Sequence, residues 1–291
     1  MNEISLRLAG GLGNQLFQLA AALYICDQNR SNLEKIYIDA RFLSKYNSSR
    51  HYEMGFISKF FPNIEVGPSK FFLCRFANRY RIARLLGGCR LGHIELISST
   101  EQLKKISQKK QFSKIVILDG YFQNPDILFN NQTREKIRNS LLMEKIQLFN
   151  SVKSGKRCTG LHIRRGDYVS NKSASRTFRE IPLDYYVQAL KRLPDDNRIL
   201  IFSDDHNLAQ SFSEKINGLN VSDLNLSLED EFCLLMACDD YVIANSTFSW
   251  WAAYLGRQND SQIISPTNWY VNRKRNANNP LLLDFFYLLD I

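Results

Sequence analysis

The sequence predicts an α/β fold of two domains, in which parallel strands form sheets covered by helices. Short apolar segments alternate with segments that have the apolar spacing of helices, most regularly in the second half of the chain. Apolar strands without a polar face are typical of parallel sheets that are buried on both sides. The chain has 291 residues and is 44% hydrophobic, enough for two modest globular domains.

The first half begins with a predicted strand, a glycine turn and a helix. Apolar and polar residues alternate over 4–8, three glycines lie within 10–13, and helical spacing covers 16–25. Residues 35–39 and 115–118 predict two further strands.

Residues 66–94 contain no acidic residue, whereas six lysines and arginines lie there among aromatic and leucine side chains. Two interpretations are open. A basic amphipathic segment can make peripheral contact with an anionic membrane, or it can be a surface helix with a basic outer face.

The second half repeats a strand, a polar turn and a helix, and it follows a predicted helix over 133–149. A run of Ser, Lys and Gly breaks that helix, so we expect the boundary between residues 150 and 151, with domains 1–150 and 151–291. The predicted strands are 158–163, 198–202, 241–244 and 262–264. The predicted helices are 183–193, 207–216, 228–238 and 248–255.

Composition limits the kind of partner that the protein is expected to bind and its expected cellular location. The net charge of +9 and the pI of about 9.2 favour an anionic partner: nucleotide phosphates, nucleic acid or an acidic membrane. We find no secretory signal and no stretch near the roughly 20 apolar residues of a membrane span, so we expect a cytoplasmic protein. The six cysteines include no Cys-x-x-Cys pair, which predicts buried free thiols.

The glycine turn reads Gly-Gly-Leu-Gly-Asn-Gln-Leu at 10–16. Such a turn lets a ligand approach the backbone, and a helix N-terminus can bind phosphate. A dinucleotide-binding loop is one interpretation, with Asp39 in the place of the ribose-binding acid. Because Leu16 stands where that motif has its third glycine, a simple tight turn is the other.

The segment His-Ile-Arg-Arg-Gly-Asp-Tyr at 162–168 closes a predicted apolar strand. Arg164 and Arg165 are poor core residues, and the planar guanidinium group holds two phosphate oxygens at once. In a cleft these arginines would neutralise a leaving pyrophosphate. The alternative is a surface salt bridge with Asp167.

Two more polar clusters end predicted strands. After the second strand of this half, a carboxylate of Asp204 or Asp205 can accept two hydrogen bonds from the Watson–Crick edge of guanine, or it can cap a helix. Asn245, Ser246 and Thr247 precede another helix, which the hydroxyl residues can cap while they donate to a phosphate. The adjacent Trp-Trp at 250–251 favours packing of that helix on the sheet over ligand stacking.

Several catalytic patterns are missing. The chain has no Asp-x-Asp, Walker A, Gly-x-Ser-x-Gly or His-Glu-x-x-His sequence, and its four histidines have no metal-ligand spacing. We therefore expect no metal cofactor, with leaving-group charge met by arginine and backbone dipoles.

Together the segments resemble the bacterial α-1,2-fucosyltransferases of glycosyltransferase family 11. The shared segments, in order, are Gly-Gly-Leu-Gly-Asn-Gln-Leu-Phe-Gln at 10–18, Gly-Tyr-Phe-Gln at 120–123, His-Ile-Arg-Arg-Gly-Asp-Tyr-Val at 162–169, Pro-Leu-Asp-Tyr-Tyr at 182–186, Phe-Ser-Asp-Asp at 202–205 and Asn-Ser-Thr-Phe-Ser-Trp-Trp at 245–251. Residues 40–110 and the tail after Asn268 match little, so the resemblance says more about the reaction than about the acceptor.

The resemblance implies a GT-B architecture, with two Rossmann-like halves facing across a cleft, the first on the acceptor side and the second binding a GDP-sugar. It implies metal-independent, inverting transfer of L-fucose from GDP-β-L-fucose to the 2-hydroxyl of a galactosyl acceptor in O-antigen or other surface polysaccharide synthesis. The implied donor contacts are His162 and one of Asp204 or Asp205 on guanine, Arg164 and Arg165 on the pyrophosphate beside Asn245, Ser246 and Thr247, and Asn14 and Gln15 from the other domain.

Asp167 is the candidate general base by position, Glu180 is the alternate, and the mechanism can also proceed without a base. Three other functions stay open: another GDP-sugar transferase of this fold, an NAD-dependent enzyme, and a nucleic-acid or membrane-binding module. Polar clusters at four strand ends favour an enzyme without a nucleic-acid partner.

Overall fold

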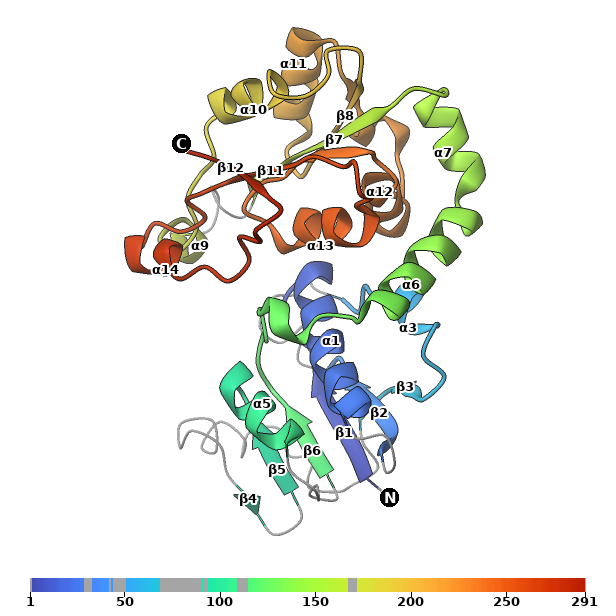
Figure 1. Cartoon of the computed structure of the whole chain (residues 1–291), viewed down its shortest axis with the longest axis vertical. Coiled ribbons are helices and arrows are strands. Elements are labelled where there is room, and N and C mark those ends of the chain that lie inside the picture. The colour runs from blue at the N-terminus through green and yellow to red at the C-terminus, as the bar shows by residue number, and fades with distance from the viewer. Residues whose placement is uncertain are drawn as a thin grey trace. The chain divides into compact units, whose positions relative to one another are not determined.

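A computed structural model of the chain describes residues 2–28, 33–41, 43, 51–68, 90–91, 94–108, 115–166 and 172–290. The chain divides into two compact units, Met1–Thr133 and Arg134–Ile291, and each is built around a six-stranded sheet flanked by helices (Figure 1). The predicted α/β class with mainly parallel sheets is confirmed. The basic stretch 66–94 lies mostly outside the described residues, so neither interpretation of it is tested.

The sheet of the first unit has the strand order β3-β2-β1-β6-β5-β4. Its strands are β1 (Asn2–Arg7), β2 (Leu33–Asp39), β3 (Ile64–Val66), β4 (Arg90–Leu91), β5 (Ile94–Ile97) and β6 (Ile115–Leu118). Its helices are α1 (Leu12–Gln28), α3 (Gly55–Ser58) and α5 (Thr100–Ser107), with a 3-10 turn η3 (Pro125–Ile127). Among the described strands, β4 runs antiparallel to β5 and the other neighbours are parallel.

Helix α1 begins at Leu12, four residues before the helix that apolar spacing predicts from Leu16. Gly10 turns the chain with a φ of +80°, a conformation that side chains disfavour. The backbone N–H groups of Asn14 and Gln15 then donate to the Gly11 carbonyl at 2.9 and 3.1 Å. The polar part of the glycine motif therefore lies inside the first helical turn.

The sheet of the second unit is parallel and has the order β12-β11-β10-β7-β8-β9. Its strands are β7 (Cys158–Ile163), β8 (Arg198–Ser203), β9 (Leu219–Asn220), β10 (Asp240–Val242), β11 (Ile263–Pro266) and β12 (Tyr287–Leu289). Its helices are α6 (Asn131–Glu144), which starts just before the division, α7 (Ile146–Lys153), α9 (Lys172–Ser175), α10 (Leu183–Leu190), α11 (His206–Ile216), α12 (Leu228–Met236), α13 (Thr247–Gly256) and α14 (Arg273–Ala277), with a 3-10 turn η4 (Val221–Leu224). The four strands and four helices predicted here are confirmed to within three residues at each end.

The division between the two compact units falls between Thr133 and Arg134, earlier in the sequence than the boundary expected between residues 150 and 151. Helices α6 and α7 belong to the second unit because their cations bind its backbone and acids. Arg134 Nη1 donates to the carbonyls of Tyr254, Leu255 and Arg257, each at 3.2 Å, and Lys145 pairs with Glu229 and Asp230 at 3.0 and 2.8 Å. The Ser-Lys-Gly run that predicted the boundary only ends α7.

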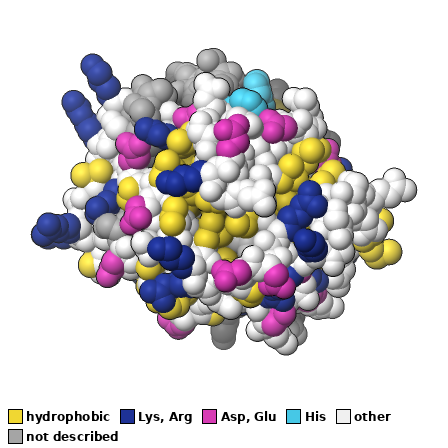
Figure 2. Space-filling view, turned by 90° about the horizontal axis from the view of Figure 1, so that it is seen from above, with side chains coloured by type: hydrophobic (Ala, Val, Ile, Leu, Met, Phe, Trp, Pro, Cys, Tyr) yellow, Lys and Arg dark blue, Asp and Glu magenta, His cyan; other side chains and the backbone are white. Residues whose placement is uncertain are grey.

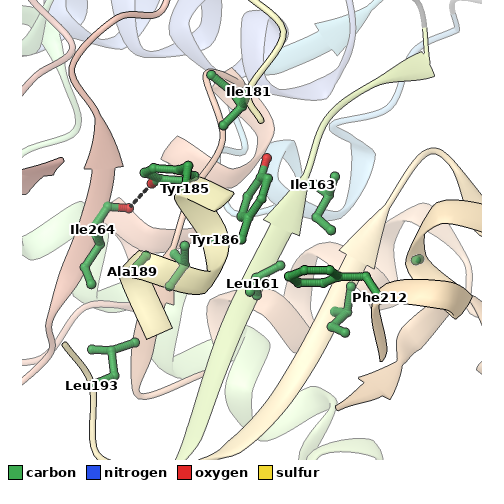
Figure 3. Packing of buried hydrophobic residues seen from close by; sticks show 12 residues of the cluster. Leu161, Ile163, Ile181, Tyr185, Tyr186, Ala189, Leu193, Phe212 and Ile264 are labelled. Atoms are coloured by element: carbon green, nitrogen blue, oxygen red, sulfur yellow. Dashed lines mark hydrogen bonds between the residues drawn. The ribbon is translucent and has the colours of Figure 1, made fainter. Parts of the chain in front are cut away.

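In the second unit, α10 and α11 lie on one face of the sheet, and α12 and α13 lie on the other (Figure 1). Tyr185 of α10 is buried, and its hydroxyl donates to the carbonyls of Ile243 and Ile264 at 2.8 and 3.1 Å (Figure 3). These bonds attach α10 to the backbone just after β10 and within β11.

Helix α13 packs closely on all sides. Trp250 and Trp251 are fully buried, and the Trp250 indole N–H donates to the Leu281 carbonyl at 2.8 Å, which confirms the packing interpretation of this pair. A Cβ atom at Gly256 would overlap the Met236 carbonyl, so α13 can approach α12 this closely only with glycine there.

Cys158, Cys233 and Cys238 are buried free thiols, as predicted, and Cys26 is a half-buried free thiol; Cys74 and Cys89 lie outside the described residues. No helix among the described residues is long and apolar enough to cross a bilayer.

A cavity of about 250 Å³ opens under α10, near the amino ends of β7 and β8. It is lined mainly by apolar side chains, including Val187, Leu190 and Ile216, with Lys191 and Asp195 among the polar ones. The face of the molecule that carries α10 and α11 shows a hollow with hydrophobic side chains and lysines or arginines around it (Figure 2). Because doubly wound sheets bind ligands at the carboxyl ends of their strands, this cavity lies at the wrong end for the predicted site.

Asp240 is the main polar link at the amino-terminal edge of the second sheet. Its carboxylate is fully buried and accepts from Arg157 Nε and Nη2 at 2.8 and 3.0 Å, from Asn197 Nδ2 at 2.8 Å and from the Gln262 N–H at 2.9 Å. Asp240→Ala would leave these donors without their acceptor, and we expect it to lower the free energy of unfolding by about 3 kcal/mol.

Urea unfolding followed by tryptophan fluorescence measures this loss, because all three tryptophans lie in the second unit. Asp260→Ala is the matched control: Asp260 also pairs with Arg157, at 2.7 Å, but its side chain is 70% exposed. We expect that control to lose less than about 1 kcal/mol. Equal losses in the two variants would contradict the assigned role of Asp240.

Candidate functional site

The predicted motifs of the second half meet at one edge of its sheet. The strand order 9-8-7-10-11-12 reverses its direction between β7 and β10. Loops that leave two neighbouring strands at such a switch point diverge and form the crevice in which doubly wound folds bind nucleotides. His162 lies near the end of β7 and Arg164 to Gly166 follow that strand. Asn245 and Ser246 follow β10 and lead into Thr247 of α13, and β8 next to β7 ends at Ser203.

Strand register brings the arginines to their partner. Ile163 of β7 pairs with Ser203 of β8, so Arg164 and Asp204 each stand one residue beyond this pair. The Arg164 Nη1 and Asp204 Oδ2 atoms are 2.8 Å apart, and the Arg165 backbone N–H donates to Asp204 Oδ1 at 2.8 Å. Asp204 therefore fixes both the side chain of one arginine and the backbone of the next.

Arg165 extends to a second acid. Its Nη2 lies 3.0 Å from Glu180 Oε1, and the two side chains are 37% and 54% exposed. The Arg164 side chain is more enclosed, at 21% exposed. The salt bridge that the sequence suggested with Asp167 cannot be compared, because Asp167 lies outside the described residues. Both guanidinium groups lie at the switch point, Arg164 paired with Asp204 and Arg165 with Glu180, in reach of an incoming anion.

Asp204 and Asp205 have different contacts, although the sequence left their roles open. The Asp205 side chain accepts from the Leu208 N–H at 3.1 Å and is the N-cap of α11. A cap of this kind stabilises a helix by about 1 kcal/mol. Asp204 contacts the arginine segment, and a Cβ atom at Gly166 would press on its carboxylate, which explains the small residue there.

His162 is buried, only 5% exposed, and its ring centroid lies 5.6 Å from that of Phe248. Its Nδ1 atom has no hydrogen-bond partner among the described residues. Burial, and next the charge of Arg164, lower the pKa of His162 from 6.5 to about 3, against the opposing effect of Asp204. The imidazole is therefore neutral at physiological pH.

The segment after β10 holds the loops around the switch point. The Asn245 Nδ2 group donates to the carbonyls of Arg179 and Trp269 at 2.7 and 2.8 Å. Ser246 is the N-cap of α13, and its hydroxyl accepts from the Phe248 N–H at 3.3 Å. Thr247 is the first residue of this helix. The N-terminus of a helix of ten residues thus opens beside the arginines, with a partial positive charge of its own.

In the first unit, Asn14 lies beyond the carboxyl end of β1, next to the loop that follows β6. Gln123, which follows β6, donates from Nε2 to Asn14 Oδ1 at 2.8 Å. Gln15 is fully buried: its Nε2 donates to the carbonyls of Gly10 and His51, and its Oε1 accepts from the Glu53 N–H. These contacts give Gln15 a role in fixing the loops, and its predicted contact with a donor stays a prediction.

Some site residues were missed at the sequence level. Gln18 links the loops after β1 and β6, because its side chain accepts from the Ala9 N–H at 3.1 Å and donates to the Gly120 carbonyl at 3.0 Å. The available signal was a glutamine among the apolar residues of the predicted helix 16–25. The structure shows that Gln18 is fully buried, and buried polar groups need hydrogen-bond partners. The Asn14–Gln123 pair joins residues 109 apart in the sequence and had no local signal.

Two α/β units, with arginines and a helix N-terminus at the switch point of the second, define a protein of GT-B-like fold. The chain belongs to glycosyl transferase family 11, whose model matches residues 94–287, and it is a glycosyltransferase. It is 30% identical over 291 residues to the O-antigen biosynthesis glycosyltransferase WbnK of Escherichia coli, with 92% of this chain and 95% of that protein covered.

Two further comparisons agree. An alpha-1,2-colitosyltransferase of Escherichia coli is 29% identical over 292 residues, with 96% of this chain and 97% of that protein covered. The fold matches NodZ, an alpha-1,6-fucosyltransferase from Bradyrhizobium co-crystallized with GDP, with a TM-score of 0.51, 17% identity, and coverage of 87% of this chain and 92% of that one.

The buried His162 predicts a dependence of stability on pH. In the unfolded chain the imidazole of His162 is protonated below about pH 6.5, whereas in the folded protein it is protonated only near pH 3. The neutral His162 therefore contributes its full stabilisation of the fold above pH 6.5, and this stabilisation is lost as the pH falls toward 3. Between pH 7 and 5, we expect the free energy of unfolding of His162→Leu to fall by roughly 1–2 kcal/mol less than that of the wild type.

Urea titrations at several pH values measure the difference. His206→Leu is the control, because the His206 side chain is 58% exposed and it should follow the wild-type curve. Parallel curves for His162→Leu and the wild type would contradict the burial of a neutral imidazole.

Proposed function

We propose that the protein transfers L-fucose from GDP-β-L-fucose to the 2-hydroxyl of a galactosyl acceptor, with inversion, in O-antigen or related surface polysaccharide synthesis. One observation carries the proposal: Arg164 and Arg165 directly follow β7 at the switch point of the second sheet, beside the N-terminus of α13. The names of the two curated relatives support a sugar transfer in O-antigen synthesis and an α-1,2 linkage.

The second unit supplies the donor site in this proposal. The pyrophosphate binds Arg164 and Arg165, whose guanidinium groups hold phosphate oxygens in pairs, and it also meets Ser246 and Thr247 at the start of α13. His162 contacts guanine through its neutral ring. Asp204 already binds Arg164, so its action on the nucleotide is to hold that arginine in place. We also propose that the donor contacts Asn14, Gln15, Asp205 and Asn245.

Bond breaking places negative charge on the departing GDP, while the sugar passes through an oxocarbenium-like state. The acceptor hydroxyl attacks the anomeric carbon from the opposite side, which inverts its configuration. Fixed cations at the pyrophosphate stabilise this charge in the transition state more than in the bound donor, and this difference lowers the barrier. No Asp-x-Asp pair is present to carry a divalent metal, so we propose that arginine and helix dipole perform this role.

Deprotonation of the acceptor hydroxyl is assigned to Asp167, whose position in the arginine segment is the basis of the proposal. Glu180 is the alternative candidate for the general base, and its Oε1 atom lies 3.0 Å from Arg165 Nη2. That contact fits a residue that orients the arginine. The loosely associated transition state also allows the proton to leave after the glycosidic bond has formed.

Another GDP-sugar is the main alternative donor, because one relative is named for transfer of a colitosyl group. The NAD-dependent alternative has less support. Asp39, its ribose-binding candidate, is 2% exposed, and both of its carboxylate oxygens are bound by Arg41 at 2.8 Å. The cytoplasmic location and the peripheral membrane contact through residues 66–94 remain proposals from the sequence.

The test is incubation of the purified protein with GDP-fucose and a panel of galactosides, with and without EDTA. We expect release of GDP and an α-1,2-fucosylated product from at least one galactoside, with no loss of rate in EDTA. A GDP-colitose arm separates the two donors. Transfer that stops in EDTA and returns with Mg²⁺ or Mn²⁺ would overturn the metal-independent mechanism.

Arg164→Ala removes the more enclosed guanidinium, and we expect it to lower kcat by about 10²–10³, the usual loss for one group that stabilises transition-state charge. Arg198→Ala is the matched control, an arginine at the amino end of β8 whose Nη1 bonds Ser154. Both variants should keep the wild-type fluorescence melt. Normal turnover by Arg164→Ala would refute the assignment.

A further inference from the structure

The loop after β6 presents an aromatic side chain at the carboxyl-end edge of the first sheet. Tyr121 is 47% exposed, although Gly120 and Phe122 on either side of it are buried. In the described part of the first unit, Tyr121 and Val66 are the large hydrophobic side chains that stand this exposed. An apolar ring left in water at a sheet edge where ligands bind calls for a partner.

The backbone around Tyr121 is fixed. The Gly120 carbonyl accepts from Gln18 Nε2 at 3.0 Å, and a Cβ atom at Gly120 would press on the Ser98 carbonyl. Phe122 has a φ of +51°, which is unfavourable for a side chain of this size, and its ring is only 4% exposed. Strained residues persist where the surrounding structure over-determines them, often at ligand sites. Because the loop backbone is held in place, a ligand that binds Tyr121 does not have to order the loop, which would cost binding free energy.

The loops after β1 and β6 are uncharged, unlike the arginine-bearing loop after β7 in the second sheet. Residues 8–15 and 120–125 contain no charged side chain. Arg7 and Asp119 end β1 and β6 and pair with each other at 2.9 Å, with side chains 11% and 20% exposed. Beyond them stands the amide pair of Asn14 and Gln123, at 2.8 Å. Amides beside an exposed ring suit the hydroxyls of a neutral sugar rather than a phosphate.

We propose that Tyr121 is the platform on which the apolar C–H face of the acceptor's pyranose ring stacks, with Gln123 binding its hydroxyls, so that this loop determines which acceptor sugar is used. A pyranose presents one face of C–H groups and a rim of hydroxyls, which matches an aromatic face next to an amide. The inference rests on the proposed function, and it names the residue that recognises the acceptor. The donor sugar is also a pyranose, but the nucleotide holds it, so the ring contributes to acceptor affinity.

The experiment compares the wild type with Tyr121→Ala, Tyr121→Phe and Tyr287→Ala. Tyr287 is 46% exposed on edge strand β12 and is the matched control. Initial rates are measured against methyl β-D-galactopyranoside at saturating GDP-fucose, and against GDP-fucose at fixed galactoside. Hydrolysis of GDP-fucose without acceptor is a third readout. Circular dichroism melts check that every variant is folded, which the exposure of both tyrosines favours.

We expect Tyr121→Ala to raise the KM for the galactoside about 5- to 10-fold, the worth of one aromatic contact. Tyr121→Phe should stay within about twofold because it keeps the ring. The KM for GDP-fucose, donor hydrolysis and the control should not change. An unchanged galactoside KM in Tyr121→Ala, or a change confined to GDP-fucose KM or hydrolysis, would overturn the inference while leaving the proposed function intact. A wild-type protein that neither transfers nor hydrolyses GDP-fucose refutes the proposed function, and the inference with it.

Discussion

In each sheet the loops that follow two neighbouring central strands, β1 and β6 in the first and β7 and β10 in the second, must be held in place. Few hydrogen bonds do this. In the second unit, Asn245 donates to the carbonyls of Arg179 and Trp269, and Asp204 holds the Arg165 N–H. In the first unit, Gln18 joins Ala9 to Gly120. Without these side chains, backbone groups beside the crevice would lack partners, and such groups are costly to bury.

The two edges differ in charge, and the difference divides the work of a transferase. One edge carries two guanidinium groups, a helix N-terminus and a buried neutral imidazole, which together favour a pyrophosphate and its base. Each guanidinium has a carboxylate partner, so the cations stay ordered before a ligand binds. At the other edge the described arginines, Arg7 and Arg41, are paired with aspartates, and the loops after β1 and β6 present amides and a tyrosine, chemistry suited to a neutral sugar.

Residues within one motif serve different purposes. In the glycine motif, Gln15 is buried against backbone groups, while Asn14 meets Gln123 at the loop edge. In the Asp-Asp segment, Asp205 caps α11 and Asp204 orients the arginines. A helix needs its cap whether or not a ligand binds, so presence in a motif does not by itself identify a ligand contact.

The sequence alone determined the alternation of strands and helices, the arginines at a strand end and the family, because apolar periodicity and local motifs are properties of short segments. It did not determine pairings set by strand register. Ile163 lies opposite Ser203, which places Asp204 on Arg164, and Leu6 lies opposite Leu118, which places Asp119 beside Arg7. The domain division also depended on tertiary contacts, since Arg134 joins α6 to the end of α13 across 120 residues of chain. Only the folded chain brings such distant residues within hydrogen-bonding distance, so only the tertiary structure decided which polar residues hold the loops and which are left for a ligand.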